Sequence, residues 1–370
     1  MIKILIDGVF FQLNNTGIAR VWQTLLSEIA RTKKFCIYFL DRGNAPVIDN
    51  IYYIKFPKYH TYNPEIDSLM IQKVCEDFKI NVFSSTYYTT PTKTSSLLTV
   101  YDMIPEVLNY NLSNSIWIEK QKAIAYAHKY ICISNNTKKD LTRFHPEIPE
   151  HRIDVCHLGV DNNNFYPRKF IDVTNFKKKY GINKQYFVLI GNRGERGHYK
   201  NCSIFFDSIY SLNKFDADIL CIGGSANLED YITTNQPQNI NCRQIYLCDD
   251  ELATAYTGAI ALVYPTLYEG FGLPVIEAMA SGCPVITTHG GSLAEVASDA
   301  AYIIDGHSIY DIQKAVYNIQ NTKLQHLLRQ KGLINACKFN WNEFTDAFIN
   351  SIIKIYIENQ NYPNTHFINK

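Results

Sequence analysis

Two glutamates, Glu269 and Glu277, stand eight residues apart on either side of a glycine-rich loop. The sequence predicts a buried strand at 261–264 before this loop, and Pro274 suits the first position of a helix after it. The residues between the first glutamate and this proline complete the candidate binding loop: Gly270, Phe271, Gly272 and Leu273. Backbone N–H groups of such a loop and of a helix N-terminus favour phosphate, and glycines permit its close approach.

The two carboxylates suit the hydroxyl groups of a ligand. Glu277, in the predicted first helical turn, can accept two hydrogen bonds from a ribose diol. Glu269, on the loop, can bind the hydroxyls of a sugar. As the alternative, Glu277 only complements the helix dipole and Glu269 is an ordinary loop charge.

A second candidate segment is basic and follows a strand predicted at 186–190. It contains Gly191, Arg193, Arg196 and Lys200. Cations in a dry cleft neutralise the charge that grows on a departing diphosphate. The two arginines are about equally good candidates, and the alternative is a solvated basic loop. A dinucleotide-binding loop is disfavoured, because no G-x-G-x-x-G follows the first strand of either half.

A third set of candidates lies in the first half of the chain. A helix is predicted to begin at Gly17, after the strand at 2–6 and a loop. Asp102 follows an apolar strand at 97–101 and is predicted to lie at the same edge of the sheet. We assign it to sugar or acceptor binding, with capping of the next turn as the alternative.

The run from Glu269 to Glu277, with the apolar segment 278–286 after it, resembles the donor-site signature of glycosyltransferase family 4. Members of that family are retaining enzymes with the GT-B fold, and the similarity extends from Asp7 to about Tyr356. The resemblance implies that Glu277 binds the ribose and Glu269 the donor hexose. It also implies that the N–H of Gly17 meets the donor phosphate.

The same resemblance implies an arginine and lysine pair at the diphosphate, and Lys200 matches the lysine. Relatives often have His-Asp where this chain has Tyr101 and Asp102, so the role of Tyr101 stays open. Asp216 and Asp218 spell the D-x-D by which the other large glycosyltransferase fold holds a metal. They precede a buried strand, away from the ligand-binding strand ends, so we expect no metal there.

Short apolar strands alternate with helices in both halves of the chain, and this pattern predicts two parallel sheets covered on both faces. The expected fold class is α/β: the GT-B fold, with two doubly wound Rossmann-like domains and a cleft between them. We predict an N-terminal acceptor-side domain at 1–165 and a C-terminal donor-side domain at 166–340. A helix at 341–370, ending in a frayed tail, is predicted to cross back to the first domain.

The amino-acid composition limits the kinds of binding partner and the cellular compartment that we expect. The formal net charge of +1 gives no reason to expect nucleic acid. Ten scattered cysteines without C-x-x-C indicate buried thiols in a reducing compartment rather than a disulfide framework. The chain shows neither a secretory signal nor an apolar run of about 18 residues, so we expect a cytoplasmic protein that touches membranes only peripherally.

The sequence thus predicts a metal-independent, retaining hexosyltransferase without a cofactor. Its expected partners are a GDP- or UDP-sugar as co-substrate and a glycan, lipid-linked or protein acceptor. Two alternatives share the fold: a nucleotide-sugar 2-epimerase, which needs acid and base residues that we do not identify, and a binding protein without activity.

Overall fold

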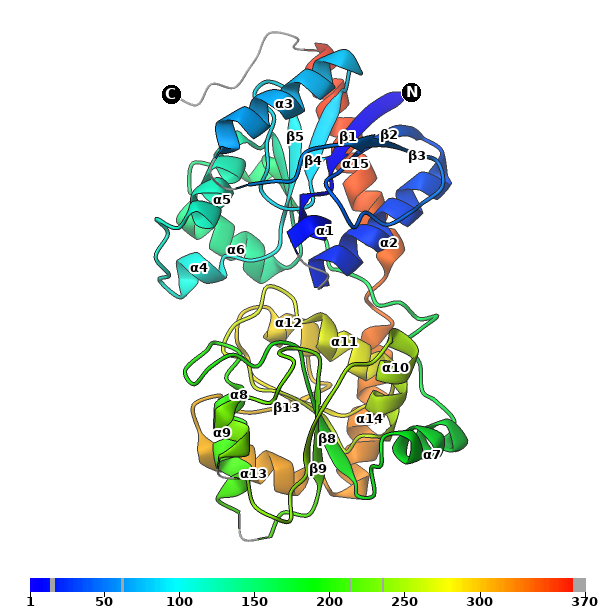
Figure 1. The fold of residues 1–370 in the computed structure, drawn as a ribbon, viewed down its shortest axis with the longest axis vertical. Helices are drawn as coiled ribbons and strands as arrows, with labels where there is room; N and C mark the ends of the chain where they lie inside the picture. The colour runs from blue at the N-terminus through cyan, green and yellow to red at the C-terminus, as the bar shows by residue number, and fades with distance from the viewer. Residues whose placement is uncertain (14–16, 61–62, 213, 235, 362–370) are drawn as a thin grey trace. The chain divides into compact units, whose positions relative to one another are not determined.

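The computed structural model describes residues 1–13, 17–60, 63–212, 214–234 and 236–361. The chain forms two compact units, one of Met1–Gly159 with Trp341–Lys370 and one of Val160–Asn340. Each unit is a parallel sheet with helices around it (Figure 1). Part of the predicted frayed tail, 362–370, lies outside the described residues.

The described part of the first unit contains a seven-stranded parallel sheet in the order β3-β2-β1-β4-β5-β6-β7. Most of its strands are apolar and largely buried, as is typical of a sheet covered on both faces. The strands are β1 (Ile2–Asp7), β2 (Phe35–Asp41), β3 (Ile51–Lys55), β4 (Val82–Ser85), β5 (Ser96–Val100), β6 (Lys129–Cys132) and β7 (Ile153–Val155). The helices are α1 (Val9–Leu13), α2 (Gly17–Thr32), α3 (Pro64–Asp77), α4 (Ile104–Val107), α5 (Ser115–Tyr126), α6 (Asn135–Phe144), the 3₁₀ turn Glu150–Arg152 and α15 (Trp341–Asn361).

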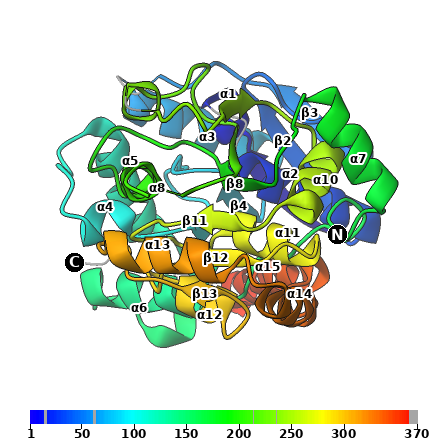
Figure 2. The same cartoon turned by 90° about the horizontal axis from the view of Figure 1, so that it is seen from below.

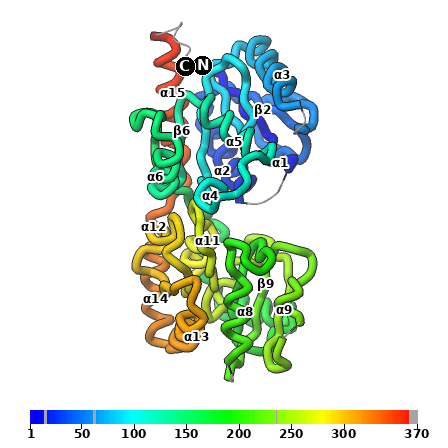
Figure 3. Tube along the Cα trace, turned by 90° about the vertical axis from the view of Figure 1, so that its left-hand side faces the viewer, coloured from blue at the N-terminus to red at the C-terminus, as the bar shows by residue number. Residues whose placement is uncertain are grey.

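The last helix, α15, packs into the first unit although it follows the whole second unit in sequence. It runs beside α2 and strands β4, β5 and β6 (Figures 1 and 3). The ring of Phe348 meets the buried ring of Trp22 edge-on, with 5.7 Å between centroids. Aromatic pairs of this geometry stabilise a core beyond the area that they bury.

The described part of the second unit contains a six-stranded parallel sheet in the order β10-β9-β8-β11-β12-β13. The strands are β8 (Tyr186–Ile190), β9 (Asp218–Ile222), β10 (Cys242–Ile245), β11 (Leu262–Tyr264), β12 (Val285–Thr287) and β13 (Tyr302–Ile303). The helices are α7 (Phe170–Lys179), α8 (Cys202–Tyr210), α9 (Asp230–Thr233), α10 (Asp249–Gly258), α11 (Leu273–Ala280), α12 (Leu293–Ala297), α13 (Ile309–Asn318) and α14 (Thr322–Ala336).

Helices α11 and α14 pack closely against each other in the second unit (Figure 2). Gly332 of α14 allows this approach, because a Cβ there would lie 3.2 Å from Cγ of Met279. The buried Asn335 donates from Nδ2 to the carbonyl of Val296 at 2.8 Å. These contacts hold α14 against α11, which begins at the glycine-rich loop, and against α12.

The described residues include all ten cysteines, and each of them is free. Five are buried, namely Cys75, Cys132, Cys202, Cys221 and Cys283. Buried thiols of this kind pack as small apolar groups.

Candidate functional site

The strand order of the second sheet brings two distant loops together. Strands β8 and β11 are neighbours, and the chain leaves them in opposite directions toward β9 and β12. The loops after these two strands therefore meet at the C-terminal edge of the sheet, where ligands of such folds bind. The N–H of Leu267 donates to the carbonyl of Tyr199 at 2.8 Å and joins the two loops directly.

Lys200 and Glu269 meet at this switch point. Nζ of Lys200 lies 2.6 Å from Oε1 of Glu269, and both side chains are largely buried. The hydroxyl of Tyr264, the last residue of β11, lies 2.9 Å from the same Oε1 and 3.4 Å from the ammonium. The structure thus places two of the predicted site residues in one hydrogen-bonded cluster.

Neighbouring side chains stabilise the charged form of Lys200. Burial, the largest single influence, lowers its pKa, but the carboxylate of Glu269 and the hydroxyls of Tyr264 and Tyr199 together raise the pKa well above its ordinary value. The site therefore presents a permanent cation with little access to water. Such a cation can neutralise a phosphate group strongly.

The backbone of Glu269 is held by the loop after β12. Its carbonyl accepts from the N–H of Ser292 at 3.0 Å and from the hydroxyl of the same residue at 3.1 Å. Gly291 lies so close that a Cβ would come within 2.3 Å of this carbonyl, and its φ of +63° favours glycine. The loop after β12 thus fixes the backbone of Glu269.

The glycine-rich loop leads into α11, which begins at Leu273, one residue before the predicted start at Pro274. Gly272 caps this helix with φ of +94°, a conformation that side chains rarely adopt. Phe271 is buried and meets Phe339 edge-on at 5.7 Å. Gly270 and Glu277 are also buried. Because α11 begins at Leu273, Glu277 lies in the second turn of this helix and not, as predicted, in the first turn.

Arg193 is a buried brace of the second unit. Its Nε lies 2.6 Å from a carboxylate oxygen of Glu229, and the two Nη atoms donate to the Gly223 carbonyl and to Oε1 of Gln244. Because all three side-chain nitrogens are engaged, Arg193 ties the β8 loop to the ends of β9 and β10. Gly191, in the same loop with φ of +87°, donates its N–H to the Ile222 carbonyl at 2.9 Å.

Arg196 lies on the surface and forms a two-pronged ion pair with Asp207 of α8, at 2.7 and 2.9 Å. About half of its side chain is exposed. The structure therefore brings Lys200 to Glu269, while each arginine binds another partner.

His198 supports the backbone of the lysine loop. Its Nδ1 accepts the N–H of Lys200 at 3.2 Å. Burial and the nearby ammonium of Lys200 lower the pKa of His198, although Glu269 opposes this shift. No role for His198 was predicted from the sequence.

The D-x-D pair lies at the opposite edge of the same sheet. Asp216 pairs with Lys184 at 2.7 Å, and Oδ1 of Asp218 accepts from Asn241 at 3.0 Å. Among the described residues, no group of three His, Cys, Asp or Glu is arranged to hold a metal ion.

In the first unit, Gly17 begins α2 and is exposed. Asp102 follows β5, and its Oδ1 accepts the N–H of Ile104 at 2.9 Å, so it caps the start of α4. Tyr101 is buried beside Trp22, and burial raises its pKa well above the ordinary value. Tyr101 is thus part of the core.

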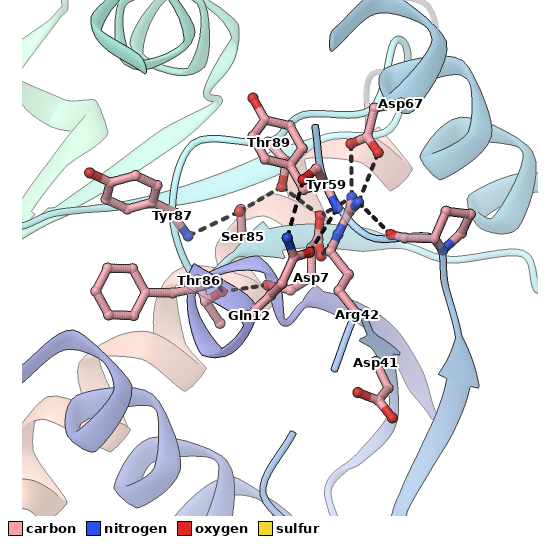
Figure 4. A network of polar contacts seen from close by, with 12 residues as sticks. Asp7, Gln12, Asp41, Arg42, Tyr59, Asp67, Ser85, Thr86, Tyr87 and Thr89 are labelled. Carbon is pink, nitrogen blue, oxygen red and sulfur yellow. Dashed lines mark hydrogen bonds and ion pairs between the residues drawn. The ribbon is translucent and has the colours of Figure 1, made fainter. Parts of the chain in front are cut away.

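A polar network lies at the switch point of the first sheet, between β1 and β4 (Figure 4). It was not predicted from the sequence. Arg42 binds both oxygens of Asp7 at 2.7 Å and both oxygens of Asp67 at 2.8 Å. Thr89 donates to Asp7 at 2.6 Å, and Pro57 accepts from Arg42 at 3.1 Å. The network joins the ends of β1, β2 and β4 to helix α3.

The second unit matches a known family. The model of the family "Glycosyl transferases group 1" matches residues 172–336, a segment that contains the Lys200–Glu269 pair. The matched segment lies within the second unit, Val160–Asn340.

Parts of the chain are also similar to curated glycosyltransferases. O-antigen chain mannosyltransferase B of Escherichia coli is 36% identical over 107 residues, which make up 29% of this chain and 28% of that protein. O-antigen chain mannosyltransferase RfbU of Salmonella typhimurium is 24% identical over 247 residues, 64% of each chain. This chain thus matches less than two thirds of the length of either relative.

Sucrose-phosphate synthase from Thermosynechococcus elongatus has a similar structure, with a TM-score of 0.79 and 14% identity over 97% of this chain and 100% of that one. The likeness and the two strand orders confirm the predicted fold class, the GT-B fold with two doubly wound Rossmann-like units. No helix in the described part of the chain combines the length and apolar character that crossing a membrane requires.

Proposed function

We propose that this chain is a retaining glycosyltransferase of family 4. It moves a hexosyl group from a GDP- or UDP-sugar to a glycan, lipid-linked or protein acceptor. The observation that carries the proposal is the ion pair of 2.6 Å between Lys200 and Glu269 at the switch point of a group 1 domain. The second unit serves the donor in this account, and the first unit serves the acceptor.

Each predicted site residue has a task in this account. Lys200 neutralises the diphosphate, and Glu269 binds hydroxyls of the donor sugar. Glu277 binds the ribose, and the backbone of the loop 270–273 faces the phosphates. Gly17 and Asp102 in the first unit contact the donor phosphate and the sugar or acceptor, respectively.

The reaction breaks the bond between the anomeric carbon and the diphosphate oxygen. The acceptor oxygen forms its bond to the same face of that carbon, and its proton passes to the leaving phosphate oxygen. As the bond breaks, negative charge grows on the diphosphate, and the buried ammonium of Lys200 stabilises it more in the transition state than in the ground state.

Arg196 is the better of the two candidates for a second cation. It is about half exposed and can leave Asp207 for a ligand at low cost, because exposed ion pairs contribute little. Arg193, in contrast, has every side-chain nitrogen engaged in a buried network. We further propose that these cations replace a metal, and that the reaction takes place in the cytoplasm, where the free cysteines stay reduced.

The test is a donor panel with purified chain. GDP- and UDP-hexoses are incubated with and without glycan acceptors, with mannose first because both curated relatives are mannosyltransferases. We expect acceptor-dependent release of one nucleoside diphosphate, also in excess EDTA, and a product whose anomeric coupling constant matches that of the donor.

Three results would count against the account. If no nucleoside diphosphate raises the melting temperature and no donor is consumed, the chain is not a transferase of this kind. If the donor sugar changes configuration without transfer, the chain is an epimerase. If EDTA stops the reaction and manganese restores it, the proposed neutralisation by cationic side chains is wrong.

A further inference from the structure

Tyr264 joins the two charged residues of the candidate site. It is the last residue of β11 and is buried, and its carbonyl accepts from the hydroxyl of Thr287 at 2.8 Å. The ring is therefore held by the sheet itself, whereas Lys200 and Glu269 lie on loops. A group on a rigid element positions its partners more sharply than a group on a loop.

The hydroxyl of Tyr264 acts as a donor. Burial, followed by the charge of Glu269, raises the pKa of Tyr264 well above its ordinary value, so the hydroxyl keeps its proton. It lies 2.9 Å from Oε1 of Glu269, the same oxygen that Lys200 approaches at 2.6 Å. One carboxylate oxygen thus receives two donors.

The two hydrogen-bond donors to Glu269, Lys200 and Tyr264, differ in what they contact during sugar transfer. The ammonium of Lys200 has a second target, the diphosphate, whose negative charge grows as the glycosidic bond breaks. The ion pair between Lys200 and Glu269 weakens as the ammonium turns toward the diphosphate. The hydroxyl of Tyr264 carries no net charge and is fixed by β11, so its bond to the carboxylate persists.

We propose that Tyr264 is a positioning residue that fixes Oε1 of Glu269, so that the carboxylate keeps its orientation toward the donor sugar while Lys200 serves the leaving diphosphate. This inference rests on the proposed function. It assigns Tyr264 to recognition of the sugar through Glu269 and not to binding of the nucleotide.

The test compares Tyr264→Phe with the matched control Tyr186→Phe. Tyr186 is also buried in the same sheet, and its hydroxyl donates to the carbonyl of Ala255 at 2.9 Å. Both variants lose one buried hydrogen bond, but only the first lies beside Glu269. In Tyr264→Phe we expect kcat to fall roughly 10- to 100-fold, the range for a lost hydrogen bond to a charged group. In Tyr186→Phe we expect kcat within about twofold of wild type.

A binding measurement distinguishes the positioning of Glu269 by Tyr264 from a general loss of order in the site. Calorimetry gives the dissociation constants of the nucleoside diphosphate and of the nucleotide sugar, and the ratio of the first to the second measures the preference for the sugar. In Tyr264→Phe this ratio should fall, while the affinity for nucleoside diphosphate stays unchanged. In a Glu269→Ala background, Tyr264→Phe should change this ratio by less than about twofold, because the group through which it acts is gone.

A Tyr264→Phe enzyme with wild-type kcat and ratio overturns the inference. It is also overturned if the substitution lowers the ratio equally in the Glu269→Ala background, or weakens nucleoside diphosphate binding as strongly as sugar binding. A wild-type chain that neither binds nor consumes nucleotide sugars refutes the proposed function itself, and the inference with it.

Discussion

Lys200 and Glu269 are 69 residues apart in sequence, yet the ammonium of one lies 2.6 Å from the carboxylate of the other. The strand order of the second sheet accounts for this approach, because β8 and β11 are neighbours and each is followed by one of the two loops. The ion pair is largely buried, and a cation and an anion held together away from water depend strongly on each other.

Glu277→Ala tests the ribose assignment. A buried carboxylate that accepts from a ribose diol should be worth roughly 1–3 kcal/mol of nucleotide affinity, so the dissociation constant of the nucleoside diphosphate should rise about 5- to 150-fold. Isothermal titration calorimetry on the folded variant measures this effect. Unchanged affinity would remove Glu277 from the nucleotide site.

Arg193→Ala should destabilise the second unit. The substitution leaves the carboxylate of Glu229 and the amide of Gln244 without their partner, and breaking a buried ion pair costs about 3–5 kcal/mol of the free energy of unfolding. Arg196→Ala, which breaks an exposed pair with Asp207, should cost less than about 1 kcal/mol. Denaturant unfolding of the two variants side by side provides the comparison, and equal losses would contradict the assignment of Arg193 as a brace.

Much of the second unit could be predicted from the sequence, because residues close together in the chain determine its strands and loops. Apolar strands followed by glycine-rich loops mark the strand ends, and the run from Glu269 to Glu277 is contiguous in the chain. The role of Arg193 could not be predicted, since Glu229 and Gln244 come from elements 36 and 51 residues away. Sequence spacing shows which charges are present, and only the packing shows which of them are already bound.

For the same reason, the polar network of the first unit could not be predicted from the sequence. Arg42, 35 residues after Asp7 and 25 before Asp67, has no motif that predicts its five hydrogen bonds. The partners of Asp7 come from the loops after β2 and β4. Asp102 shows the capping contact that was the alternative interpretation, and its contact with a sugar stays a prediction.

His198→Asn tests how the lysine loop depends on pH. The folded protein lowers the pKa of His198, so at a pH below the ordinary histidine value the unfolded chain binds a proton that the native state resists. The free energy of unfolding should therefore fall as the pH drops through this region. An asparagine keeps an acceptor for the N–H of Lys200 but does not titrate, so this fall should become smaller. Identical pH profiles of stability for wild type and variant would show that His198 does not contribute.

The most direct test of the whole account is the kcat of Lys200→Ala, measured with saturating donor beside Lys184→Ala. The control removes a lysine of the same unit that pairs with Asp216 at the opposite edge of the sheet. We predict that Lys200→Ala lowers kcat roughly 100- to 1,000-fold, with a much smaller change in donor affinity, because its charge acts mainly on the departing diphosphate. Lys184→Ala should behave as wild type. A Lys200→Ala enzyme with wild-type kcat and only a raised KM would contradict the account, because Lys200 would then bind the donor without stabilising the transition state.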